Sequence, residues 1–255
     1  MKAMVLAAGL GTRLRPLTND LPKALVEVGG RTLLEITLTR LRDFGVREVI
    51  INVHHFAEMV EAYLKAKNNF GLQIEMSRED VLLDTGGGLK KAGHFFYDNS
   101  AREDLGGEEP FILHNVDVIS NIDFKQMLKF HAEKNALATL AVQDRPTSRY
   151  LLFDESLQLC GRQAGRDGNP ELVRPARAQQ PLAFSGIHVI SPRFLRMMTE
   201  PGAFSIIDTY VRLAGQGEKI VAFRADKYYW RDLGKPENVA QAAADIANKR
   251  VVLTN

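Results

Sequence analysis

Two glycines and two cations near the start of the chain have the spacing of a phosphate-binding loop. Gly9 and Gly11 follow directly after the short apolar run at residues 3–8, and Arg13 and Lys23 come next along the chain. Small residues allow backbone N–H groups to approach a phosphate closely. Arginine can grip two phosphate oxygens at once, whereas lysine acts as a compact point charge. The segment is therefore predicted to bind an anionic ligand.

Two better-known glycine loops do not fit this segment. A dinucleotide fingerprint needs a third glycine three positions after Gly11, where the chain has Leu14. A Walker A loop needs a Gly-Lys-Ser/Thr triplet, which is absent here. A plain tight turn would account for a lone Gly-x-Gly. It would not account for the additional Thr12, Arg13 and Lys23, so the anion-binding interpretation is kept.

Two aspartates stand where strands are expected to end. Asp117 follows the apolar run at residues 111–113, and Asp232 comes just after Tyr229 and Trp230. Open α/β sheets bind ligands beyond the carboxyl ends of their strands. A pair of carboxylates there suits Mg²⁺, which takes hard oxygen ligands and adds phosphate oxygens and water. For either aspartate alone, a role in a turn or as a helix N-cap is the simpler interpretation.

The remaining candidate groups favour structural roles. His54 and His55 are adjacent, so on a strand they point to opposite faces and are not expected to share a metal. His114 is interpreted as an ordinary histidine at a strand end, and Cys160 as a neutral thiol. A serine nucleophile is not expected, because the chain has no Gly-x-Ser-x-Gly elbow.

Alternating strands and helices are expected to position the candidate residues. Short apolar runs predict buried strands, and apolar residues recurring at a spacing of three or four predict helices. Gly45 is expected to cap the first of these helices. The strands expected in the first half are 3–8, 49–53, 72–76 and 111–113, and the helices are 32–44, 56–64, 86–96 and one after Asp123. This alternation favours a mostly parallel sheet with helices on both sides.

The pattern changes after about residue 137. Strands are predicted at 137–142, 149–154 and 183–190 with few helices between them, which favours mixed, partly antiparallel pairing. The segment 161–180 is rich in Arg, Gly, Gln and Pro and is predicted to be a loop or lid. Two helices, near 205–214 and 236–249, are expected to flank a strand pair at 219–223 and 228–232.

Composition excludes several classes of protein. The chain has 255 residues, 45% of them hydrophobic, which is enough for one α/β domain. A net charge of +2 without a long Lys/Arg run does not predict nucleic-acid binding. No apolar stretch approaches 18 residues, so no membrane span is expected. A single cysteine fits a reducing cytoplasm and excludes an intrachain disulfide framework.

Taken together, the motifs resemble those of the sugar-1-phosphate nucleotidyltransferase family. The signature Gly9-x-Gly11-Thr12-Arg13-Leu14-x-Pro16-Leu17-Thr18, followed by Pro22-Lys23, is specific for that reaction class. The resemblance covers nearly the whole chain. It is nearest to the short bacterial members related to N-acetylmuramate-1-phosphate uridylyltransferase, with mannose- and heptose-1-phosphate guanylyltransferases close behind. Further supporting motifs are Leu83-Asp84-Thr85-Gly86-Gly87-Gly88, Asn115-Val116-Asp117, Phe184-Ser185-Gly186-Ile187 and Trp230-x-Asp232-x-Gly234.

The resemblance implies a fold and a set of ligands. The implied fold is a Rossmann-like three-layer α/β sandwich with a mostly parallel mixed sheet and a small substrate-side β subdomain. One nucleotidyltransferase domain would span residues 1–255, with a nucleotide-binding half at 1–136 and a sugar-binding half with the C-terminal helix at 137–255. The implied substrates are a nucleoside triphosphate and a sugar 1-phosphate, and the implied cofactor is Mg²⁺ on Asp117 and Asp232. The oligomeric state stays open.

The resemblance also assigns roles to individual residues. The sugar phosphate would attack the α-phosphoryl group directly as pyrophosphate departs. Arg13 would hold the β- and γ-phosphates, and Lys23 would bridge the α-phosphate and the sugar phosphate. The expected catalytic residues are Arg13, Lys23, Asp117 and Asp232. The expected nucleotide contacts are Leu6, Ala7, Ala8, Gly9, Gly11, Thr12, Arg13, Lys23, Ser77 and Glu79. The expected sugar contacts are Gly86, Gly87, Asn115, Ser185 and Gly186.

The chain departs from the family pattern at three places. Val116 stands where the family usually has glycine and is expected to add bulk beside the sugar or ribose. Lys235 stands where threonine is usual, either as a cation near the phosphates or as a solvated residue at a helix start. No Glu-Lys-Pro triplet precedes Phe184, so that sugar and phosphate contact is unassigned, with Arg174 or Arg177 as substitutes.

The resemblance leaves the base open and competes with two other interpretations. UTP is expected, with GTP as the alternative. A catalytically silent, nucleotide-sugar-binding regulatory protein would be expected to lose one of the four catalytic residues, and all four are present. A glycosyltransferase of related fold would need an Asp-x-Asp pair, which Asp117-Val118-Ile119 does not supply.

Overall fold

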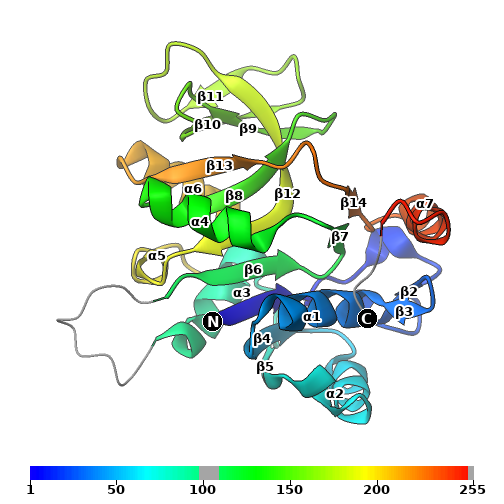
Figure 1. The fold of residues 1–255 in the computed structure, drawn as a ribbon. Helices are drawn as coiled ribbons and strands as arrows, with labels where there is room; N and C mark the ends of the chain where they lie inside the picture. Colours follow the sequence, from blue (N-terminus) through cyan, green and yellow to red (C-terminus); the bar gives the residue numbers. More distant parts are fainter. Residues whose placement is uncertain (98–108, 252–255) are drawn as a thin grey trace. The chain divides into compact units, whose positions relative to one another are not determined.

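The computed structural model describes residues 1–97 and 109–251 (Figure 1). Contacts within the chain divide it into two compact units. Unit 1 comprises Met1–Asp84, Leu113–Ile122 and Tyr228–Asn255, and unit 2 comprises Thr85–Ile112 and Asp123–Lys227. None of the described helices is long and apolar enough to cross a membrane. The division of 1–136 and 137–255 by ligand stays a prediction.

Parallel strands form the framework of unit 1. The strands of its main sheet are β1 (Lys2–Leu6), β4 (Glu48–Val53), β5 (Gln73–Arg78) and the last three residues of β6 (Phe111–Asn115), of which Phe111 and Ile112 count with unit 2. β4 pairs in parallel with both β1 and β5, and the register places Leu6, Asn52 and Ser77 side by side. The interiors of β1 and β4 are buried, as their apolar runs predict. Because β1, β4 and β5 are parallel, their carboxyl ends share one edge.

Helices and two short strand pairs complete unit 1. The helices are α1 (Leu33–Phe44), α2 (Ala57–Ala66) and α7 (Pro236–Ala247), with short 3₁₀ turns at Thr12–Leu14, Lys23–Leu25 and Asn68–Gly71. The strand pairs are β2 (Glu27–Val28) with β3 (Arg31–Thr32), and β7 (Val118–Ser120) with β14 (Trp230–Asp232). The predicted cap at Gly45 is confirmed, since this residue ends α1 at φ 112°.

Unit 2 is built largely from antiparallel strands. Its strands are β8 (Ala138–Gln143), β9 (Arg149–Phe153), β10 (Leu159–Ala164), β11 (Pro170–Leu172), β12 (Gln180–Ile190) and β13 (Ile220–Arg224). Its helices are α3 (Asp84–Lys91, of which Asp84 counts with unit 1), α4 (Phe124–Lys134), α5 (Arg193–Arg196) and α6 (Ile206–Gly215), and a 3₁₀ turn covers Ala92–Phe96. The long strand β12 pairs antiparallel with both β8 and β9, while β13 pairs in parallel with β8. The mixed pairing predicted for this part of the chain is confirmed.

Two predictions about the second half of the chain are wrong. Residues 161–180, predicted to be a loop or lid, include most of β10 and all of β11, which pair antiparallel. These strands are short and partly exposed, so they lack the apolar alternation that marks a strand in sequence. The strands near 219–223 and 228–232 do not pair with each other, because β13 joins β8 and β14 joins β7.

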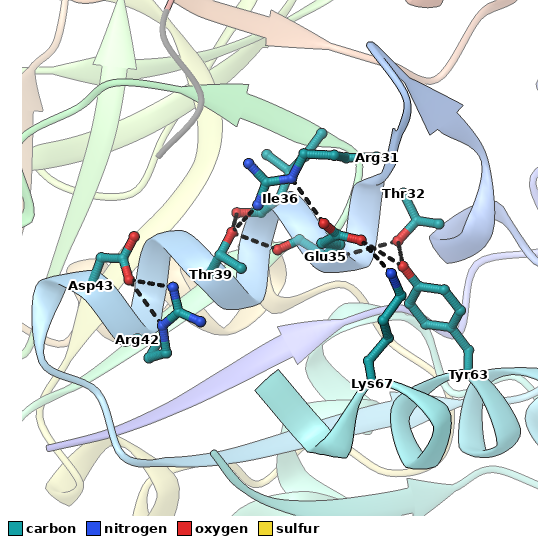
Figure 2. A network of polar contacts seen from close by, with 9 residues as sticks. All are labelled: Arg31, Thr32, Glu35, Ile36, Thr39, Arg42, Asp43, Tyr63 and Lys67. Carbon is teal, nitrogen blue, oxygen red and sulfur yellow. Dashed lines mark hydrogen bonds and ion pairs between the residues drawn. The ribbon is translucent and has the colours of Figure 1, made fainter. Parts of the chain in front are cut away.

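A polar network fixes the start of α1 against α2 (Figure 2). The Glu35 carboxylate accepts hydrogen bonds from Arg31 Nε at 3.0 Å and from the Tyr63 hydroxyl at 2.8 Å, and Lys67 Nζ lies 3.7 Å away. Burial and the hydrogen bond to Glu35 raise the pKa of Tyr63 to about 12. Burial alone would raise the pKa of Glu35, but the bonds from Tyr63 and Arg31 bring it below its usual value.

Thr32 is the N-cap within this network. Its hydroxyl accepts from Glu35 N at 3.0 Å and donates to Tyr63 Oη at 3.1 Å. We expect Thr32→Ala to lower the free energy of unfolding by about 1–2 kcal/mol, because an orphan N–H of the first turn loses its acceptor. Urea unfolding measures the effect. Thr32→Ser, which keeps the hydroxyl, should lose less, and equal stability of Thr32→Ala and wild type would contradict the capping role.

Candidate active site

The loop after β1 is shaped by Gly11. This residue has φ 65°, and a Cβ there would lie 3.0 Å from Thr18 Cγ2 and 3.2 Å from Lys23 Cβ. The Thr18 hydroxyl donates to Gly11 O at 2.8 Å, which closes the loop on itself. A glycine at position 11 is therefore required both by the backbone conformation and by the close approach of Lys23. Gly9, in contrast, has open space where a side chain would be.

Arg13 lies against the turn that carries Asp232. A Cβ at Gly234 would lie 2.8 Å from Arg13 Nη2 and 2.8 Å from Asp232 Oδ1. The backbone N–H of Gly234 donates to the same Asp232 oxygen at 2.8 Å. The cation and the carboxylate therefore both lie next to Gly234, where an added side chain would make one or both of them shift.

Lys23 forms an ion pair with Asp117. Its Nζ contacts Asp117 Oδ2, and the two side chains are only 13% and 12% exposed. Asp117 and Asp232 come together because β7 pairs with β14, and Leu233 N donates to Asp117 O at 2.7 Å. The structure thus brings the four residues predicted to be catalytic, Arg13, Lys23, Asp117 and Asp232, into one region of unit 1.

The two aspartates can be tested as metal ligands on their remaining oxygens. Asp117 Oδ2 contacts Lys23, and Asp232 Oδ1 accepts from Gly234 N. Among the described residues, the other oxygen of each carboxylate accepts no hydrogen bond. No group of three or more His, Cys, Asp or Glu side chains in the described parts of the chain could hold a metal. Two carboxylates with one available oxygen each fit Mg²⁺, which completes its shell with water and phosphate oxygens.

Asn115 and Val116 lie just before Asp117. Asn115 Oδ1 is buried and, within the described chain, has no hydrogen-bond partner. A buried acceptor without a partner calls for a ligand or water, so the position agrees with a ligand contact. Val116 is 2% exposed and donates its N–H to Leu6 O at 3.1 Å. Its side chain is therefore mostly covered by the protein, and the expected bulk beside the sugar or ribose stays a prediction.

A buried side-chain network lies at the ends of β1, β4 and β5. Asn52 Oδ1 accepts from Ala7 N at 2.8 Å, and Asn52 Nδ2 donates to Glu79 Oε1 at 2.7 Å. Glu79 Oε2 accepts from Leu83 N at 2.9 Å. Ser77 and Glu79, two of the predicted nucleotide contacts, are both buried, whereas Asn52 was not among the predicted residues. The signal for Asn52 was an amide inside the otherwise apolar run 49–53.

The predicted sugar contacts other than Asn115 lie in unit 2. Gly86 and Gly87 pack at the start of α3, where the Gly86 N–H donates to Phe204 O at 2.9 Å. A Cβ at Gly86 would lie 2.3 Å from Phe204 Cε2, so packing within unit 2 alone requires this glycine. Ser185 and Gly186 fall where the register of β12 against β8 shifts, and Gly186 has φ 72°. Such irregularities often re-aim side chains next to a site.

Three residues stand where the family pattern is missing or altered, namely Arg174, Arg177 and Lys235. Arg174 pairs with the buried Asp154 and donates to Gln158 Oε1 at 3.2 Å. Arg177 is exposed, and Lys235 is an exposed residue at the N-cap of α7. His54 Nδ1 lies 2.7 Å from Glu79 O, which ties this histidine to the network at the strand ends.

A buried histidine, His114, lies near the end of β6, three residues before Asp117. His114 is 1% exposed; its Nδ1 lies 2.8 Å from Asn115 O and its Nε2 lies 3.4 Å from Arg40 Nη1. Arg40 also donates to Ser120 Oγ at 3.1 Å and to Ile122 O. Burial, together with the neighbouring Arg40 charge, lowers the pKa of His114 to about 3. The ring is therefore neutral at pH 7.

The depressed pKa of His114 predicts acid sensitivity. Between the unfolded pKa near 6.5 and the folded value of about 3, the unfolded chain binds a proton that the folded chain does not. The free energy of unfolding should therefore fall as the pH is lowered through this window. In urea titrations between pH 7.5 and 4.5, His114→Gln should show a shallower decline than wild type, and identical slopes would contradict the assignment.

Comparison with known proteins gives the family. The family model described as nucleotidyl transferase matches residues 2–249. The chain is 36% identical over 255 residues to N-acetylmuramate alpha-1-phosphate uridylyltransferase of Caulobacter vibrioides, covering 96% of each chain. It is 29% identical to a mannose-1-phosphate guanyltransferase of Yarrowia lipolytica, covering 93% of this chain and 62% of that protein.

Solved structures agree on the fold. A putative glucose-1-phosphate thymidylyltransferase from Bacillus anthracis has a TM-score of 0.78 at 16% identity, covering 100% of this chain and 98% of that one. HddC from Yersinia pseudotuberculosis, complexed with GMP-PN, has a TM-score of 0.72 at 21% identity, covering 96% and 99%. The expected α/β class with a mixed sheet is confirmed. From its sequence, site and fold, the chain belongs to the nucleotidyl transferase family and is a sugar-1-phosphate nucleotidyltransferase.

Proposed function

We propose that this protein transfers uridylyl groups from UTP to a sugar 1-phosphate, with Mg²⁺, releasing pyrophosphate. The observation that carries the proposal is the convergence of Arg13, Lys23, Asp117 and Asp232 in unit 1. Two cations and two carboxylates in one place suit a reaction in which phosphate charge moves and is neutralised. The proposed reaction needs no protein nucleophile.

Each of these residues has a task in the proposed reaction. Arg13, whose guanidinium lies beside the turn at Gly234, would grip the departing pyrophosphate with its bidentate fork. Lys23 would leave its contact with Asp117 for the phosphates that meet during transfer. Bound Mg²⁺, with Asp117 and Asp232 as ligands, would neutralise charge on the triphosphate. The main chain of Ala7, Ala8 and Gly9 would hold the nucleotide, and the cytoplasm would supply both substrates.

The choice of base rests on the relatives. The relative at 36% identity is named a uridylyltransferase, and several at 28–30% are named guanylyl- or guanyltransferases. The name of the relative at 36% identity also favours an N-acetylmuramate-type sugar 1-phosphate as substrate. The higher identity and the nearly full coverage of both chains favour UTP over GTP.

A pyrophosphate-release screen tests the function. Four nucleoside triphosphates are crossed with a panel of sugar 1-phosphates that includes N-acetylmuramate 1-phosphate. We expect UTP to have the highest kcat/KM. A tenfold preference for GTP, equivalent to about 1.4 kcal/mol, would reverse the assignment of the base. No turnover with any pair, despite nucleotide binding, would point to a silent nucleotide-sugar-binding protein.

The metal role of Asp117 predicts a loss of turnover without loss of fold. EDTA should abolish pyrophosphate release, and Asp117→Asn should remove most activity because the amide is a poor Mg²⁺ ligand. The matched control is Asp123→Asn, since asparagine can still cap α4. Full activity in EDTA, or a fully active Asp117→Asn enzyme, would remove the metal role.

The two cations should matter more to turnover than to binding. Arg13→Ala and Lys23→Ala should each lower kcat on the order of 10²-fold, as loss of a preorganised electrostatic group does elsewhere. Arg13→Lys should not restore full activity, because the fork is gone. Lys65→Ala, on the exposed face of α2, is the control and should stay at the wild-type rate. Folded Arg13 and Lys23 variants within threefold of wild-type kcat/KM would contradict these roles.

A further inference from the structure

We infer that Arg40 is a positioning residue that holds the turn bearing Asp117 by hydrogen bonds to the chain on both sides of it. The inference rests on the proposed function, in which Asp117 and Asp232 are the Mg²⁺ ligands. Arg40 and the residues it contacts all belong to unit 1. The proposed reaction gives Arg40 no task of its own, although its guanidinium reaches the chain on either side of Asp117.

The guanidinium of Arg40 contacts three residues around the turn. Its Nη1 donates to Ser120 Oγ at 3.1 Å and lies 3.4 Å from His114 Nε2, and its Nη2 donates to Ile122 O. His114 is in β6, Ser120 ends β7, and Asp117 lies in the turn between the two strands. The planar fork of an arginine has several fixed donors and can span two strands, whereas a lysine ammonium is a compact point charge.

The proton on His114 connects Arg40 to the main chain before Asp117. His114 Nδ1 lies 2.8 Å from Asn115 O, and a carbonyl oxygen only accepts, so we place the ring hydrogen on Nδ1. Nε2 of the neutral ring then accepts from Arg40 Nη1, which only donates. This agrees with the burial and the Arg40 charge that lower the pKa of His114 to about 3. Arg40 thus acts through His114 on the carbonyl two residues before Asp117.

α1 gives Arg40 a fixed base. The first turn of this helix is tied to α2 by the hydrogen bond between Glu35 and Tyr63 (Figure 2). Leu38 and Leu41, close to Arg40 along the helix, are fully buried. Because the helix is held at its start and packed along its length, the bonds from Arg40 tie the turn to a rigid element.

The bond to Ser120 also concerns Asp232. β7 pairs with β14, and the register sets Ser120 against Trp230 and Val118 against Asp232. Holding Ser120 therefore holds the strand pair that brings Asp232 to Asp117. Mg²⁺ demands near-ideal octahedral geometry, so displacement of either carboxylate weakens a shared ion. Groups that orient metal ligands typically contribute about 10–100-fold to metal affinity.

A purely electrostatic role for Arg40 makes the opposite prediction. A positive charge near two carboxylates repels a metal cation, so its removal alone would strengthen Mg²⁺ binding. Loss of a positioning contact would weaken Mg²⁺ binding. The sign of the change therefore separates the two roles.

The measurement is the dissociation constant of UTP by calorimetry, once with Mg²⁺ and once in EDTA, without sugar phosphate and at a temperature where each variant is folded. The ratio of the metal-free value to the Mg²⁺ value reports how strongly the metal supports nucleotide binding. In wild type we expect a ratio on the order of tenfold or more, within the usual range for two coupled ligands. Arg40→Met should lower this ratio at least about fivefold, because the metal ligands are displaced, and should leave the metal-free value within about twofold of wild type.

Two further variants test how Arg40 acts. Arg40→Lys keeps the charge but not the fork, so it should resemble Arg40→Met. Ser120→Ala should lower the ratio by itself but add little in the Arg40→Met background, since both changes remove the same bond. The matched control is Arg42→Met on the same helix, because Arg42 donates to Asp43 and to Phe70 O instead. This control should keep the wild-type ratio.

The outcomes separate this inference from the proposed function. A ratio for Arg40→Met that is unchanged, raised or lowered less than about fivefold overturns the positioning role, as does an equal loss of affinity with and without Mg²⁺. Full rescue by Arg40→Lys, or fully additive effects of Ser120→Ala and Arg40→Met, overturns it as well. If Arg40→Met does not fold, Arg40→Lys carries the same comparison. A wild-type protein that binds no UTP, or binds it equally with and without Mg²⁺, overturns the proposed function instead.

Discussion

Where the backbone leaves the sheet at the end of β1, its buried N–H and C=O groups still need hydrogen-bond partners. Other parts of unit 1 supply these partners. Leu6 O receives the N–H of Val116, and the Ala7 N–H is received by Asn52. Buried N–H and C=O groups without partners are rare because each costs free energy. The first partner is next to Asp117 and the second leads to Glu79, so the same two bonds help to place the Asp117 turn and the loop after β5.

Charge compensation is the second organising feature. Lys23 and Asp117 are both mostly buried, and either charge alone would be costly in that environment. Their contact keeps the region electrically balanced when no substrate is present. In the proposed reaction, a phosphate would take the place of Asp117 beside Lys23, and Mg²⁺ would take the place of Lys23 beside Asp117. The ion pair therefore keeps both charged side chains in the site while neither charge is left without a partner.

The sequence could predict the features that depend on neighbouring residues along the chain. The apolar runs of β1 and β4, the helical spacing and the Gly45 cap of α1, and the loop cations were all readable. The β10–β11 hairpin was not, because its exposed strands have no apolar alternation. Asn52 was missed because its partners are 45 and 27 residues away. The sequence also could not show why position 86 needs a glycine, because Phe204, which packs against it, is distant in sequence.

The discontinuity of unit 1 has a consequence for synthesis. Its three stretches come from the beginning, the middle and the end of the residues described, and β14 supplies Asp232 only after all of unit 2 has been made. During translation the N-terminal stretch must wait for its partners, although domains generally fold as units as they emerge. Until β14 leaves the ribosome, the nascent chain lacks half of its aspartate pair. The order of synthesis thereby keeps partly made chains from carrying the complete proposed site.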